Sequence, residues 1–150
     1  MEIIKIDSTQ AHLVYELFNQ YRIFYKQQPG IELAKKFIDA RLNNNESVIF
    51  IALNESNPIG FTQLYPNYSS VRAIKNWTLN DLYVDSNYRK KGIGEKLIKT
   101  AMEFAKNDNA NFVELSTAVD NYTAQSVYEK IGFKKQEPDT AFYTYRIDLS

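Results

Sequence analysis

A strand pattern that runs into a basic, glycine-containing turn and then into a helix constrains the fold more than any other part of the sequence. Leu82–Val84 is an apolar run typical of a buried strand. The turn that follows contains Arg89–Gly94, and from Ile93 to Phe104 apolar residues recur at helical spacing. A strand joined by a short turn to an amphipathic helix indicates a layered protein in which the helix packs on a sheet.

Strand and helix patterns alternate along the rest of the chain. Alternating or β-branched apolar runs predict strands, and apolar residues at helical spacing predict helices. The order of these strand and helix patterns along the chain predicts an α/β (α+β mixed) protein with helices on both faces of a sheet. The expected strands are residues 2–6, 47–53, 59–65, 71–84 (or from 73), 112–117 and 142–149; the expected helices are residues 11–26, 33–42, 93–104 and 124–131, with Gly132 closing the last one and residues 66–70 forming a polar loop.

The composition fits one globular domain spanning residues 1–150. Lys and Arg together number 18, as do Asp and Glu, so no net field attracts nucleic acid and no nucleic-acid partner is expected. The lack of cysteine excludes disulfides, thiolate metal sites and a cysteine nucleophile, and no metal is expected. No signal peptide or bilayer-spanning apolar run is found, so we expect a cytoplasmic location and no membrane partner.

The turn before the helix at Ile93 has the properties of an anion site. Backbone N–H groups at a helix start lack intrahelical partners, and the helix dipole is positive there. Gly92 and Gly94 allow a ligand to approach the backbone closely, and three basic residues precede them. These properties suit a pyrophosphate. The turn matches neither a Walker A loop nor the Gly-x-Gly-x-x-Gly dinucleotide pattern, and a solvated basic turn is the alternative interpretation.

Two segments resemble motifs of one enzyme superfamily. Arg89–Gly94 resembles the Arg/Gln-x-x-Gly-x-Gly/Ala signature of the GNAT superfamily of N-acetyltransferases. Asn121–Phe133 resembles the second family segment, Asn-x-x-Ala-x-x-Leu/Phe-Tyr-x-x-x-Gly-Phe. The order of elements is also similar to the family fold over nearly the whole chain. The resemblance implies a central, mostly antiparallel sheet with helices on both faces and a splay between the fourth and fifth strands. It also implies an acetyl-CoA-dependent N-acetyltransferase.

The same resemblance implies residue roles around the donor, acetyl-CoA. Asn121 would contact the pantetheine or the part near the phosphates, and Tyr128 would protonate the leaving thiolate. From the residues alone, the alternatives are a helix N-cap for Asn121 and a core position for Tyr128 on the apolar face of its helix. Leu82 and Val84 would bind the pantetheine arm and orient the acetyl carbonyl, and the pyrophosphate would be held by Arg89, Lys90, Lys91, Gly92, Ile93 and Gly94.

The general base is expected at the end of the strand that precedes the basic turn. Asn80–Val84 resembles the Glu-Asp-aromatic-Phe-Val segment of spermidine/spermine N-acetyltransferases, but Asn80 stands where that family has an acid, and an amide cannot accept a proton. Asp81 is therefore expected to anchor the amine or act as the base, with a structural salt bridge or a water chain as the alternative accounts. Without a cysteine, the simplest mechanism is direct attack in a ternary complex.

The acceptor pocket is expected near the first helices. The chain resembles a GNAT branch related to histone and polyamine acetyltransferases, in which the first two helices shape this pocket. Tyr21, Tyr25, Tyr65 and Asn80 are the expected acceptor-binding residues, with the tyrosines forming an aromatic wall for a cation. Core packing of the same tyrosines is the alternative. The expected acceptor is a primary amine of a small molecule, such as a polyamine or an amino-acid-like compound.

Two other functions are compatible with the same residues. A non-catalytic acyl-CoA sensor is favoured by Asn80, whereas Tyr128 argues against it. A protein or peptide amine as acceptor is the second, because a fold does not specify its substrate. Family members often pair as dimers through sheet edges or the C-terminal strand, so a homodimer through residues 142–149 is also expected.

Overall fold

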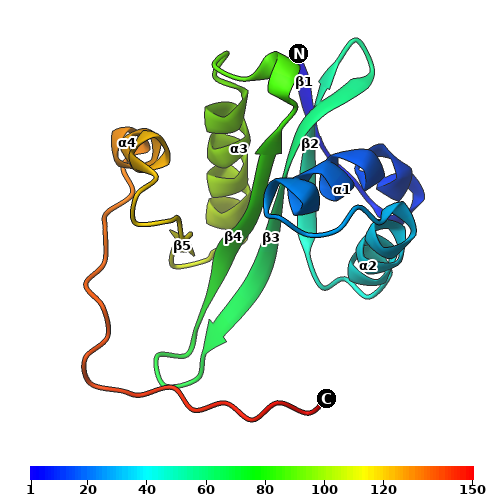
Figure 1. Ribbon diagram of the computed structural model, residues 1–150. Helices are drawn as coiled ribbons and strands as arrows, with labels where there is room; N and C mark the ends of the chain where they lie inside the picture. The colour runs from blue at the N-terminus through cyan, green and yellow to red at the C-terminus, as the bar shows by residue number, and fades with distance from the viewer. The chain divides into compact units, whose positions relative to one another are not determined.

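A computed structural model describes all 150 residues of the chain, which divide into two compact units, Met1–Ser116 and Thr117–Ser150. The first unit is built on a five-stranded sheet with the strand order β1-β2-β3-β4-β5 (Figure 1). Its strands are β1 (Glu2–Lys5), β2 (Val48–Asn54), β3 (Asn57–Ser69), β4 (Ile74–Val84) and β5 (Val113–Glu114).

The first four strands pair antiparallel, and β5 pairs parallel to β4. The parallel contact is confined to Trp77↔Val113 and Thr78↔Glu114, near the start of β4. Residues 79–84 of β4 therefore have a strand partner on the β3 side only. The expected fold, with its splay between the fourth and fifth strands, is confirmed.

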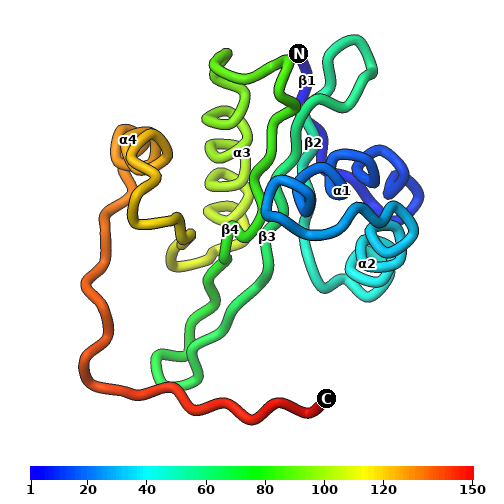
Figure 2. The backbone as a smooth tube through the Cα atoms, in the orientation of Figure 1, coloured from blue at the N-terminus to red at the C-terminus, as the bar shows by residue number.

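Helices cover both faces of this sheet. The 3-10 segment η1 (Ser8–Leu13), α1 (Tyr15–Phe24) and α2 (Ile31–Asn43) lie on one face, and α3 (Ile93–Asn107) lies on the other (Figures 1 and 2). The prediction of one continuous helix from residue 11 to residue 26 is wrong. Asp7 caps η1, and Val14 separates η1 from α1.

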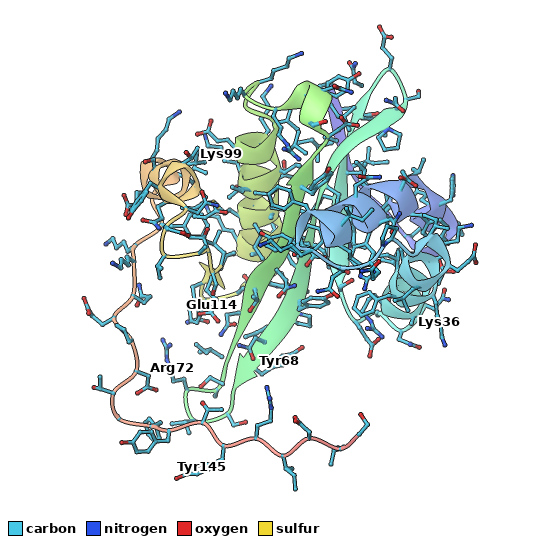
Figure 3. The ribbon with its side chains drawn as sticks, viewed as in Figure 1. Lys36, Tyr68, Arg72, Lys99, Glu114 and Tyr145 are labelled. Carbon is cyan, nitrogen blue, oxygen red and sulfur yellow. The ribbon has the colours of Figure 1, made fainter.

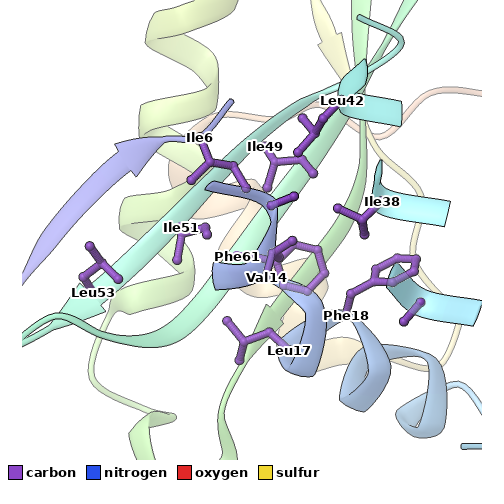
Figure 4. Close-up of a cluster of buried hydrophobic side chains, with 12 residues drawn as sticks. Ile6, Val14, Leu17, Phe18, Ile38, Leu42, Ile49, Ile51, Leu53 and Phe61 are labelled. Carbon is purple, nitrogen blue, oxygen red and sulfur yellow. The ribbon is translucent and has the colours of Figure 1, made fainter. Parts of the chain in front are cut away.

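The main core lies between the sheet and the first two helices. Each large aliphatic side chain buried there stabilises the fold by about 1.5–3 kcal/mol. Phe18 of α1 stacks on Phe37 of α2 and meets the edge of Phe61 of β3 (ring centroids 5.5 and 6.2 Å). This packing fixes α1 against α2 and β3. The cluster comprises Ile6, Ala11, Val14, Leu17, Phe18, Ala34, Ile38, Leu42, Ile49, Ile51, Leu53 and Phe61 (Figure 4).

On the other face, α3 is fixed to β4 by apolar and polar contacts. Trp77 packs against Phe104, and its indole N–H donates to the Asp108 carboxylate at 2.9 Å. Lys75 forms an ion pair with the same carboxylate at 2.8 Å. The hydrogen bonds from Lys75 and Trp77 lower the pKa of Asp108. The end of α3 is thereby held at the start of β4, and its first turn is positioned beyond the end of β4.

Residues 66–70 are not the loop that the polar sequence predicts. β3 continues to Ser69 and pairs with β4 as far as Ser69↔Ile74. Pairing with β2 ends at Leu64, so Pro66 lies where β3 has only one strand neighbour. A proline is tolerated there because its missing N–H faces an open edge. In Figure 2 this hairpin extends beyond the helices of the first unit, and Figure 3 shows Tyr68 and Arg72 on it.

The second unit contains one helix, α4 (Tyr122–Ile131). Asn121 caps it by accepting a hydrogen bond from the Ala124 N–H at 3.1 Å, and Gly132 ends it with φ 121°, as expected. The strand expected at residues 142–149 is absent, because no other strand pairs with this segment. Its apolar side chains are exposed, from 79% for Phe142 to 93% for Leu149 (Figure 3 labels Tyr145). None of the helices combines the length and apolarity needed to cross a membrane.

Candidate active site

A β-bulge in β4 places an acidic residue in the interior. Gln63 of β3 pairs with Asp81 and the next residue, Leu64, pairs with Leu79, so Asn80 has no partner. In a regular strand, Asn80 and Asp81 would point to opposite faces. Here the Asn80 side-chain amide donates to Asp81 Oδ1 at 2.7 Å. The bulge therefore brings the two side chains together.

Asp81 is 2% exposed and is held by neutral hydrogen-bond donors. The Gln63 side-chain amide donates to Asp81 Oδ2, and the Thr62 hydroxyl donates to the Asp81 backbone carbonyl at 2.8 Å. Burial raises the pKa of Asp81, because a charge in the interior loses solvation, and the hydrogen bonds from Asn80 and Gln63 oppose this effect. No Lys, Arg or His forms an ion pair with it. The structural salt bridge considered for Asp81 is therefore absent.

Two half-buried tyrosines lie near this carboxyl. The Tyr21 hydroxyl, from α1, donates to the Asn80 carbonyl at 3.3 Å. Burial, and then the negative charge of Asp81, raises the pKa of both Tyr21 and Tyr65. Both side chains are therefore neutral phenols at physiological pH. The structure thus brings four predicted site residues together: Asp81, Asn80, Tyr21 and Tyr65.

An aromatic cluster connects this position to solvent. The Tyr21 ring meets the edges of Tyr25 and Tyr83 at centroid distances of 5.1 and 6.5 Å. Phe24 contacts both Tyr25 and Tyr83. Tyr25 is 60% exposed and Phe24 58%, whereas Phe61, which packs under Tyr21, is fully buried. We call Tyr21, Phe24, Tyr25 and Tyr83 the aromatic wall, which runs from the surface to the residues around Asp81 and contains Tyr21 and Tyr25 of the three tyrosines expected there.

Beyond Asp81, the backbone of β4 presents hydrogen-bonding groups at an edge without a strand neighbour. The Asp85 N–H donates to the Ile59 carbonyl at 2.8 Å. Because hydrogen-bonding direction alternates along an antiparallel pair, Leu82 and Val84 direct their backbone groups away from β3. That edge is not covered by β5. Leu82, and Val84 through its N–H, therefore meet the geometric requirement for an extended ligand arm that pairs with β4.

The turn into α3 is open and adopts left-handed backbone conformations. Lys90 has φ 62° and Gly92 has φ 78°. Gly92 is the N-cap of α3, and as a glycine it provides no side-chain hydrogen bond to cap the helix. A Cβ atom at Gly92 would meet no atom within 4 Å. Gly94 follows in the helix, and the Ile93 side chain is buried beneath the turn. The site fits a phosphate group that the backbone binds.

The three basic side chains of this turn differ in their contacts. Arg89 folds back on the end of β4, where its Nε donates to the Val84 carbonyl at 2.9 Å. Its guanidinium group lies over the rings of Phe24 and Tyr83 at 5.5 and 5.4 Å. Lys91 lies over the Tyr88 ring at 5.4 Å, and Lys90 is exposed. Arg89 thus links the basic turn to the aromatic wall, a contact that the sequence does not indicate.

Tyr128 and Asn121 belong to the second unit. Tyr128 is half-buried, its ring meets Phe133 edge-on at 6.1 Å, and its carbonyl accepts the N–H groups of Gly132 and Phe133. The N-cap role considered for Asn121 is confirmed. Sequence reasoning missed Gln63 and Ser47, whose side chains join Asp81 in a buried polar chain. A glutamine inside the apolar run of residues 59–64 was the available signal.

Comparison with known proteins identifies the class. The model of the Acetyltransferase (GNAT) family matches residues 11–133. An uncharacterized N-acetyltransferase, YhfO, of Bacillus subtilis is 41% identical over 149 residues, which cover 99% of this chain and 98% of that protein. The chain belongs to the GNAT acetyltransferase family. Its class is that of an acetyl-CoA-dependent N-acetyltransferase.

Solved structures agree with this assignment. The crystal structure of a probable acetyltransferase is 37% identical, with a TM-score of 0.88, and the match covers 100% of this chain and 99% of that one. An aminoglycoside N-acetyltransferase in complex with CoA shares the fold at 19% identity, with a TM-score of 0.79 and coverage of 97% and 95%.

Proposed function

We propose that the chain transfers the acetyl group of acetyl-CoA to a primary amine of a small molecule by direct attack in a ternary complex. The observation that carries this proposal is a buried carboxyl, Asp81, that no basic residue of the protein neutralises. Buried charges are normally paired. A ligand ammonium group at the inner end of the aromatic wall would supply the missing cation.

Asp81 then has two consecutive tasks. A free alkyl ammonium group has a pKa of about 10.4 and must lose a proton before it can attack. The carboxylate first binds the ammonium group, and then accepts its proton. A carboxyl whose pKa is raised by burial is a stronger base than an exposed one, which favours this transfer. Asn80 holds Asp81 Oδ1 through its amide and takes no proton itself.

The other proposed roles follow the family pattern. The amides of residues 89–94, together with Lys90 and Lys91, bind the pyrophosphate of the donor. The backbone of Leu82 and Val84 pairs with the pantetheine arm, and the Val84 N–H stabilises the oxyanion that forms on the acetyl carbonyl. Tyr128 donates its phenolic proton to the thiolate that leaves when the C–S bond breaks, and Asn121 contacts the donor near the pantetheine. We propose that residues 1–150 act as one domain, because the family match runs through both units.

The chemical class of the acceptor amine is inferred from the aromatic wall. Its rings favour a cation with an aliphatic stem, because a cation gains from aromatic faces and a stem gains from apolar contact. We therefore favour a polyamine or an amino-acid-like amine, as in the branch related to histone and polyamine acetyltransferases. The aminoglycoside N-acetyltransferase fold match makes aminoglycosides a second group to test.

The deciding experiment measures CoA thiol release from acetyl-CoA with purified protein and a panel of polyamines, amino acids, thialysine, aminoglycosides and basic peptides. We expect release with one class of small amine. We also expect its loss in Asp81→Asn, which keeps the shape of the side chain but cannot accept the proton. Release only with basic peptides would favour a protein acceptor. Acetyl-CoA binding without release from any amine would favour a sensor.

We also propose a homodimer. Residues 142–149 expose Phe142, Tyr143, Tyr145, Ile147 and Leu149 almost completely. Large exposed apolar groups in one short segment mark an interaction surface. A second copy of the chain is the partner that the extended segment favours, because a strand-like segment with free backbone groups pairs readily with another chain.

A further inference from the structure

A chain of buried polar side chains crosses the sheet and ends on the proposed base. Ser47, directly before β2, donates its hydroxyl to Gln63 Oε1 at 2.7 Å. The Gln63 amide nitrogen in turn donates to Asp81 Oδ2. Ser47 is 9% exposed, Gln63 is fully buried and Asp81 is 2% exposed. Bulk water therefore does not compete for these contacts.

The chemistry of the groups fixes the direction of this chain. An ionised carboxylate only accepts hydrogen bonds, so the Gln63 amide must turn its NH2 group toward Asp81. Its carbonyl then faces Ser47, whose hydroxyl is able to donate. If Gln63 flipped, its carbonyl oxygen would face the carboxylate. The carboxylate thus selects the amide orientation, and Ser47 satisfies the amide oxygen that this orientation turns away from Asp81.

The second amide on the carboxylate occupies a different environment. Asn80 donates to Oδ1 from the bulge, but Asn80 is exposed, whereas Gln63 is enclosed by the sheet. With one donor on each oxygen, both oxygens keep a lone pair for a further partner. Gln63 therefore restrains the carboxylate rotation from the buried side and leaves a lone pair on each oxygen for an ammonium group.

A buried glutamine at this position has no advantage for stability alone. Burying an amide costs free energy that its hydrogen bonds roughly offset, and an apolar side chain of similar size would pack without that cost. We propose that Gln63, whose amide oxygen accepts a hydrogen bond from Ser47, is a positioning residue that holds the Asp81 carboxylate where it meets the acceptor ammonium and takes its proton. This inference rests on the function proposed above.

Few other groups influence the carboxylate. Tyr21 from α1 and Tyr65 from β3 face it as neutral phenols, and Arg41 and Glu46 act on Tyr65. The ionised form is thus favoured against burial by the hydrogen bonds of Asn80 and Gln63. Removing the Gln63 amide should raise the proton affinity of Asp81, because a hydrogen bond to the charged form favours that form.

The test compares Gln63→Met, which keeps the volume but loses the amide, with Ser47→Ala and the control Thr62→Val. Thr62 is equally buried and bonds to the Asp81 backbone rather than to its carboxyl. Side-chain carboxyl 13C NMR, assigned with Asp81→Asn, gives the titration midpoint of Asp81 without any substrate. We expect Gln63→Met to raise the midpoint by about one pH unit, Ser47→Ala to raise it less, and Thr62→Val to leave it unchanged.

A kinetic readout then links the midpoint to the reaction. The acceptor is spermidine, or the panel amine that gives the fastest thiol release. In Gln63→Met, the acidic limb of the plot of kcat/KM against pH should move to higher pH by the same amount as the titration midpoint of Asp81. If Gln63→Met leaves the titration midpoint of Asp81 unchanged, the inference about Gln63 is overturned, whereas the role of Asp81 is not affected. If Gln63→Met does not fold, an unchanged midpoint in Ser47→Ala overturns the inference instead. A shifted midpoint with an unmoved limb overturns the role proposed for Asp81, and with it the purpose assigned to Gln63.

Discussion

At the scale of single residues, Asp81 has the least favourable environment in the molecule for its charge. It is almost fully buried, and only neutral groups donate to it. The sequence identifies Asp81 as a candidate, but it does not show that the carboxyl lacks an ion pair. Whether Asp81 has an ion pair depends on the side chains that α1 and β3 place beside it. The bulge at Asn80 determines the face of the sheet on which Asp81 lies.

The raised pKa of Asp81 predicts how stability depends on pH. The folded protein binds this proton more tightly than the unfolded chain does, so the contribution of Asp81 is complete below its ordinary pKa of about 3.9 and is lost as pH rises through the raised value. Wild type should therefore lose more free energy of unfolding between pH 4 and pH 8 than Asp81→Asn does. Urea denaturation across this range measures the difference.

The control for this experiment is Glu55→Gln, which removes a carboxyl from the exposed turn between β2 and β3. This variant should keep the wild-type pH dependence. Equal slopes for wild type and Asp81→Asn would contradict the assignment of a buried, destabilised charge at this position.

At the scale of elements, the strand-turn-helix from β4 to α3 shows what local patterns determine. Apolar runs, helical spacing and glycine turns are local properties, so the sequence predicts α2, α3, α4, β1 and β2 to within a few residues. Three expectations depend on distant contacts and are wrong: β3 extends through Pro66, the first helix is divided at Val14, and residues 142–149 form no strand. Whether a segment pairs depends on its neighbours, which periodicity does not encode.

The turn at Gly92 predicts opposite effects on helix stability and donor binding. Gly92→Ala places a residue with a Cβ atom at φ 78°, and the resulting backbone strain should lower the free energy of unfolding by about 1–2 kcal/mol. Gly92→Glu adds a negative charge at the start of α3, where the helix dipole favours it. Relative to Gly92→Ala, we expect Gly92→Glu to be at least as stable but to bind acetyl-CoA about tenfold more weakly, because the carboxylate repels the pyrophosphate.

Calorimetric titration with acetyl-CoA and thermal denaturation of both variants measure these two effects. Equal affinities for acetyl-CoA in the two folded variants would remove the pyrophosphate from this turn. A lower stability of Gly92→Glu than of Gly92→Ala would show instead that the turn is closed rather than open.

At the scale of the whole molecule, the exposed apolar side chains are distributed unevenly. Those of the first unit include Tyr25 and Phe24, which belong to the proposed acceptor wall, and Val71, which lies alone in the β3–β4 turn. Those of residues 142–149 are clustered in an extended segment without a strand partner. Burying one such side chain is worth about 1.5–3 kcal/mol, so covering several of them on a second copy gives a strong driving force for association.

The proposed dimer leads to a direct test in solution. Sedimentation of the full chain at micromolar concentration should give a dimer, and the variant Tyr145→Ser with Ile147→Ser should shift toward monomer, because the loss of two buried side chains weakens association by several kcal/mol. Val71→Ser removes a side chain that is 99% exposed and isolated, so it should leave the dimer intact. A monomeric wild type at this concentration would contradict a second copy as the partner. A dimer unaffected by the double substitution would place the interface elsewhere on the chain.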